Sequence, residues 1–131
     1  MKTKPLCFSA SFLVLMPGLL FAHHNFRSVF DTDLPVEVTG TVTEVKWTNP
    51  HARFYLDVEA EDGEIISWEF ELASPNSLFR RGWKRDSLKP GDIVTVTGAR
   101  ARKAPHLANT STVTRSDGQN VFGATLTSPP E

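Results

Sequence analysis

The chain has very little sulfur. Its 131 residues include one cysteine, Cys7, and two methionines, Met1 and Met16, and all three lie near the amino terminus. One cysteine cannot form an intrachain disulfide, and the residues after position 16 offer neither a thiolate nucleophile nor a sulfur ligand for copper(I). A metal bound by this later part must be held by histidine, carboxylate, backbone groups or a terminal amine.

The chain also lacks a long hydrophobic run. A basic start, residues 1–4, precedes an apolar stretch at 6–16 that Pro17-Gly18 ends before Ala22. A membrane span needs about 20 unbroken apolar residues. The pattern instead predicts a cleavable signal peptide over residues 1–22, export to the periplasm and no transmembrane anchor after cleavage.

Charge of one sign is not in large excess. Cleavage would remove Lys2 and Lys4 and leave 109 residues with 12 basic and 15 acidic side chains. This length suits one domain, and the net negative charge argues against a general nucleic-acid binder. Two basic clusters, at 80–85 beside Trp83 and at 100–103, resemble single-stranded nucleic-acid surfaces. An acidic partner protein or the anionic envelope surface would fit them equally well, and a plain solvated face fits them best.

Alternation of apolar and polar residues predicts a mostly β domain. The alternation slips near Thr43-Glu44, which predicts a β-bulge, and Gly40 permits a bend. In the third strand the even-numbered positions from Ile66 to Leu72 should face inward, with Glu69 and Glu71 facing outward. The expected strands cover about 36–47, 53–58, 66–72, 93–98, 110–114 and 121–126.

One short helix interrupts the strands. Ser74-Pro75 is a capping hydroxyl followed by a first-turn proline, and Gly82 is a stop signal. Three strands, a helix and further strands predict a small five- to six-stranded Greek-key barrel of the oligonucleotide/oligosaccharide-binding (OB) type. A β-sandwich is the alternative, but it gives this helix no role. The expected organisation is an amino-terminal arm at 23–34, the barrel at 35–127 and a disordered tail at 128–131.

Several motifs together resemble an uncharacterised family of exported bacterial proteins, a domain of unknown function. They include His23-His24, Trp47-Thr48-Asn49-Pro50-His51, Trp68 with Glu71, and 88–98. The resemblance implies export and a small β barrel and supplies no reaction. Asn25 stands where the family usually has serine, and Lys103-Ala104-Pro105 replaces a glycine turn just before His106.

The histidines are the candidate metal ligands. After cleavage at Ala22, His23 would offer its α-amino group and its imidazole as a chelate, and His51 or His106 would add another imidazole. His24 could take part instead through its amide nitrogen and ring. Amine and imidazole nitrogens suit copper(II). The sequence therefore suggests a copper(II) site from His23, His24 and His51, with His106, in a loop beside Pro105, as the weaker candidate. A solvated arm would also explain His23-His24, and a hydrogen bond to the turn backbone would also explain His51.

A second hypothesis needs no metal. Trp47, Arg53, Tyr55 and Glu71 should lie near one barrel face, where an OB-type module would bind a carbohydrate, another small ligand or an envelope protein. Glu69 and Glu71 resemble a catalytic carboxylate pair only superficially, because a cross-strand charge ladder explains them. No nucleophile elbow or phosphate loop occurs, so we do not expect an enzyme.

Overall fold

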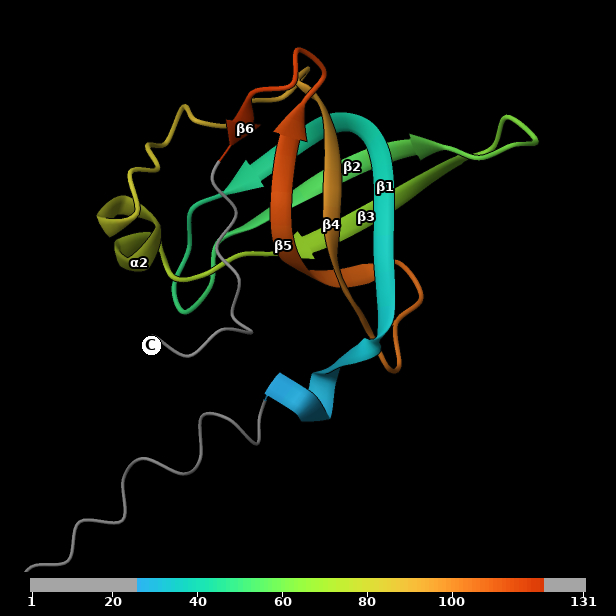
Figure 1. The fold of residues 1–131 in the computed structure, drawn as a ribbon, viewed down its shortest axis with the longest axis horizontal. Coiled ribbons are helices and arrows are strands. Elements are labelled where there is room, and N and C mark those ends of the chain that lie inside the picture. Colours follow the sequence, from blue (N-terminus) through green and yellow to red (C-terminus); the bar gives the residue numbers. More distant parts are fainter. Residues whose placement is uncertain (1–25, 122–131) are drawn as a thin grey trace, which may run out of the picture.

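The computed structural model describes residues 26–121 (Figure 1). The predicted signal peptide 1–22, the histidines His23 and His24, and the predicted tail 128–131 lie outside the described residues. So does most of the strand expected at 121–126. Residues 26–29 form a helical turn that leads into the first strand.

The first three strands form an antiparallel meander. They are β1 (Phe30–Lys46), β2 (Arg53–Glu59) and β3 (Ile65–Glu71). The predicted bulge is confirmed, because the β1–β2 register shifts between Val42 and Glu44. An extra residue at this point bends β1, and this helps the strand to curve around the barrel.

Helix α2 (Pro75–Arg80) follows β3, as the capping signals predict. The hydroxyl of Ser74 accepts a hydrogen bond from the amide of Ser77 at 3.3 Å, which satisfies one of the free amides of the first turn. After the helix, Gly82 has φ of 90°, a conformation that favours glycine, and the chain turns away.

The remaining strands close the sheet into a barrel. They are β4 (Ile93–Ala101), β5 (Leu107–Arg115) and the short β6 (Asn120–Val121). β4 pairs antiparallel with β1 and β5, and β5 pairs in parallel with β3. The five main strands therefore form a closed circuit, and the predicted all-β fold with one short helix is confirmed.

β1 begins earlier than the sequence suggested. The arm was expected to extend to residue 34, yet Phe30 pairs with Ala101 and Asp31 with Arg100 before the register shifts at Pro35. This prediction was wrong because pairing with a distant strand, rather than local alternation, orders these residues. A register shift within one strand interrupts the alternation of apolar and polar residues, so the sequence pattern does not reveal where such a strand begins.

One hydrophobic core fills the barrel, and a smaller cluster lies beside it. Phe54, Phe70 and Leu56 are among the fully buried side chains, and Phe54 and Phe70 stack at 5.3 Å. The predicted inward row of β3 is confirmed by the buried side chains of Trp68, Phe70 and Leu72. The smaller cluster contains Phe30, Ala99 and Ala101, with Phe26, Ala104 and Leu107 packed against it.

Candidate functional site

The candidate site begins with His51, at the end of the β1–β2 connection. Thr48 donates a hydrogen bond from its hydroxyl to the carbonyl of His51 at 3.3 Å. The neighbouring Ala52 exchanges backbone hydrogen bonds with Ala73 and Leu72 at 3.0 and 2.8 Å. The backbone of His51 is therefore held against the end of β3.

The side chain of His51 is fixed by a carboxylate. Its Nδ1 lies 2.7 Å from Oε1 of Glu71, whose side chain is only 13% exposed. Because an ionised carboxylate can only accept, Nδ1 is the protonated nitrogen in this contact. In the neutral ring, Nε2 then keeps its lone pair, and the 37% exposed side chain is accessible to a ligand.

Arg53 completes a cross-strand network on the same face. Its guanidinium lies 3.0 Å from Glu69 Oε1 and 3.5 Å from Glu71 Oε2. The register pairs Arg53 with Glu71 and Tyr55 with Glu69, as expected from the outward alternation of β2 and β3. We call His51, Arg53, Glu69 and Glu71 the β2–β3 polar cluster.

Tyr55 extends this face toward β1. The ammonium of Lys46 lies 4.8 Å from the centroid of the Tyr55 ring. A side-chain hydrogen bond to Glu44 and the charge of Glu44 raise the pKa of Lys46, with a smaller contribution from Tyr55. One side of the Tyr55 ring is therefore already partnered by a cation.

Trp47 lies in a separate aromatic group. Its ring stacks on Phe79 at 5.3 Å and meets Trp83 edge to face at 6.4 Å. Trp47 is half-buried, and its Nε1 is buried without a hydrogen-bond partner in the described structure. Trp47 therefore packs between the barrel and α2 rather than with Arg53 in the polar cluster.

His106 occupies a different environment from His51. It is exposed, and its ring meets Trp68 edge to face at 5.2 Å, on the inward row of β3. The structure does not combine these two histidines: within residues 26–121, no three histidine, cysteine, aspartate or glutamate side chains form a group that could hold a metal ion.

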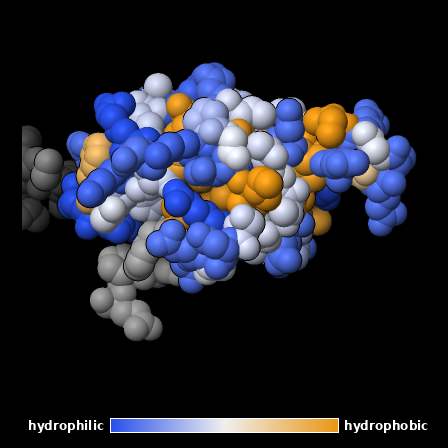
Figure 2. Space-filling view, turned by 90° about the horizontal axis from the view of Figure 1, so that it is seen from above, coloured by the Kyte–Doolittle hydropathy of each residue, from blue (hydrophilic) through white to orange (hydrophobic). Residues whose placement is uncertain are grey.

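The basic clusters differ in their partners. Arg102 is structural, because its guanidinium pairs with Asp31 at 2.7 Å and donates to the carbonyl of Arg27 at 3.1 Å. In contrast, Arg80 and Arg81 are exposed and form no ion pair within the described chain. The hydrophilic surface around α2 is visible at one end of Figure 2.

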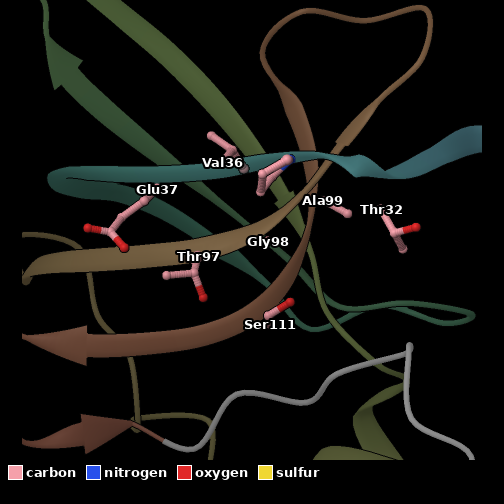
Figure 3. Close-up of a pocket in the computed structure, with 8 residues that line it drawn as sticks. Thr32, Val36, Glu37, Thr97, Gly98, Ala99 and Ser111 are labelled. Carbon is pink, nitrogen blue, oxygen red and sulfur yellow. The ribbon is translucent and has the colours of Figure 1, made fainter.

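Sequence reasoning missed an open hollow on the outer face of β1, β4 and β5. It measures about 540 Å³, and Figure 3 shows Thr97, Ser111 and Glu37 among the residues that line it. Register shifts in β1 and between Thr97 and Gly98 shape this region. No local motif marks it, because these strands meet only in the folded sheet.

The fold defines the class as a small, mostly antiparallel β barrel with one short helix. The model of a family of unknown function, DUF6152, matches residues 13–109, and the chain belongs to that family. No curated protein and no solved structure matches the chain. In residues 26–121, no helix is long and apolar enough to cross a membrane.

Proposed function

We propose that this chain is an exported periplasmic protein that binds copper(II) through its processed amino terminus and His51. In this proposal cleavage after Ala22 makes His23 the first residue. Its amine and imidazole form one chelate, and Nε2 of His51 supplies a third nitrogen. His24 is the alternative donor at the terminus.

The contact between His51 and Glu71 is the observation that carries the proposal. Metal-binding histidines usually donate their second ring N–H to a carboxylate, carbonyl or water, which fixes the ring and strengthens it as a ligand. Nδ1 of His51 makes such a contact at 2.7 Å. The partly buried Glu71 is itself oriented by Arg53, so the imidazole is preorganised.

The presence of a carboxylate partner for the imidazole also ranks His51 above His106. His106 contacts Trp68 through its ring, and no carboxylate partner of His106 occurs in the described residues. His106 nevertheless follows Ala104, which packs against the same small cluster as Phe26. His23 precedes Phe26 by three residues, or at most about 11 Å of extended chain, so His106 is the second candidate for completing the chelate.

The test is a copper(II) titration of the mature protein beginning at His23. We expect one tight site, and electron paramagnetic resonance of the loaded protein should show nitrogen ligands. A variant with four extra alanines before His23 turns the amine of His23 into an amide and moves both histidines beyond position three, so that no amino-terminal chelate forms, and it should bind at least tenfold more weakly. Equal affinity of the two forms would refute the terminal chelate.

His51→Ala and His106→Ala identify the additional imidazole. We expect the His51 substitution to remove one nitrogen from the resonance spectrum and the His106 substitution to leave the spectrum unchanged. The reverse result would transfer the role to His106.

The metal-independent alternative uses the same barrel face. Arg53 is 45% exposed on its side chain and lies beside Tyr55, so this face could orient a carbohydrate or an envelope protein. Binding that persists after chelation of metal and in His23→Ala would favour this alternative over copper(II).

A further inference from the structure

The edge of β3 is paired over only part of its length. Residues Glu69–Glu71 pair with Leu107–Asn109 of β5. In the described chain, residues 65–68 have a strand neighbour on the β2 side alone. Figure 1 shows this part of β3 within a hairpin that extends away from the barrel.

The orientation of the free backbone groups follows from alternation along the strand. The amide of Leu72 bonds to Ala52 on the β2 side at 2.8 Å, whereas the amide of Glu69 bonds to His106 on the β5 side at 2.9 Å. Backbone groups two residues apart point in the same direction. The N–H and C=O groups of Ile65 and Ser67 therefore face the open side.

Space and exposed hydrophobic surface adjoin this edge. A hollow of about 390 Å³ lies between Ser67 and the loop that includes Pro105 and His106, with Trp68 in its lining. Ile65 is 57% exposed, more than any other large hydrophobic residue in residues 26–121. Figure 2 shows hydrophobic surface just behind the hydrophilic tip of the hairpin.

The charges at the hairpin determine the kind of partner. Its tip carries acidic side chains with no ion-pair partner in residues 26–121, namely Glu59, Glu61, Asp62 and Glu64. An antiparallel pair of β3 edges from two copies would bring the acidic hairpin tip of each copy alongside the strand of the other copy that carries Glu69 and Glu71. Like charges disfavour that pairing and favour a basic occupant.

We propose that the open edge of β3, residues 65–68, binds an extended basic segment of a partner protein by β-strand addition. The backbone of Ser67 and Ile65 provides the hydrogen bonds, the exposed Ile65 and the hollow beside Ser67 receive apolar side chains on the outward face of β3, and the acidic tip attracts the basic ones. The open edge at residues 65–68 contains none of the proposed copper ligands, although His106, the second candidate ligand, lines the adjoining hollow.

The test uses an acetylated octapeptide of alternating lysine and valine, followed by nuclear magnetic resonance of the labelled mature protein. We expect saturable shifts at the amides of Ile65 and Ser67, with slowed hydrogen exchange at Ser67. The matched peptide of alternating glutamate and valine should bind at least tenfold more weakly.

Ser67→Pro and Ser67→Ala form the matched pair of variants. Proline removes the edge amide in a backbone position that edge strands tolerate, so we expect about tenfold weaker peptide binding, while alanine should bind like the parent. Circular dichroism verifies that both variants fold. Unperturbed edge amides, equal binding by the two variants, or self-association through this edge would each overturn the proposal.

Discussion

At the scale of single residues, His51 is the better candidate ligand because its side chain contacts Glu71, and not merely because it is a histidine. The sequence contains four histidines, and their spacing alone does not rank them. The fold brings Glu71 from β3 to within 2.7 Å of Nδ1 of His51, while His106 meets an aromatic ring. Outward alternation predicted that Glu71 would face Arg53, but the contact with His51 depends on the path of the β1–β2 connection.

This difference predicts the effect of Glu71→Gln. The amide keeps the shape but loses the charge that orients and strengthens the imidazole, so copper(II) affinity should fall about 10- to 100-fold. Isothermal titration calorimetry of the mature protein measures the change.

Glu69→Gln is the control, because Glu69 pairs with Arg53 but not with His51. This substitution should alter copper(II) affinity by less than about threefold, because Glu69 does not contact His51 and so does not orient its ring. Equal losses in both variants would mean that charge on this face, rather than orientation of His51, governs binding.

At the scale of elements, alternation and capping predicted most of the structure. The bulge in β1, the inward row of β3 and the helix between Ser74 and Gly82 all follow from local patterns that the structure confirms. The beginnings of β1 and β5 did not follow, because Phe30 and Leu107 owe their places to distant partners. Long-range pairing leaves no periodic signature in a single segment.

Gly98 provides a test at this scale. A Cβ atom at this position would clash with the backbone carbonyl of Asn109, in the bulged part of the β4–β5 pair. Gly98→Ala should therefore destabilise the barrel by about 3 kcal/mol, as expected for overpacking against a backbone that cannot easily move. Urea denaturation measures the free energy of unfolding.

Gly63→Ala is the matched control for Gly98→Ala. Gly63 has φ of 84° but open space around its Cβ position, so the cost should be about 1 kcal/mol, from backbone conformation alone. Equal destabilisation of the two variants would show that the close approach at Gly98 is not what limits substitution.

At the scale of the whole molecule, closure of the barrel determines which segments that are distant in the sequence lie close together. The parallel pairing of β3 with β5 joins the strand that carries Glu71 to the strand that follows His106. Phe26, at the start of the described chain, packs against the same cluster as Ala104 and Leu107. The sequence could predict the barrel, but not that the amino-terminal arm is anchored on this side.

The most direct measurement is the intact mass and amino-terminal sequence of the protein recovered from the periplasm of cells that express the full chain. The copper(II) proposal requires a mature protein of 109 residues that begins at His23. A chain that retains residues 1–22, or one that begins at any other residue, would lack the terminal imidazole-amine chelate. That result would contradict the copper(II) proposal.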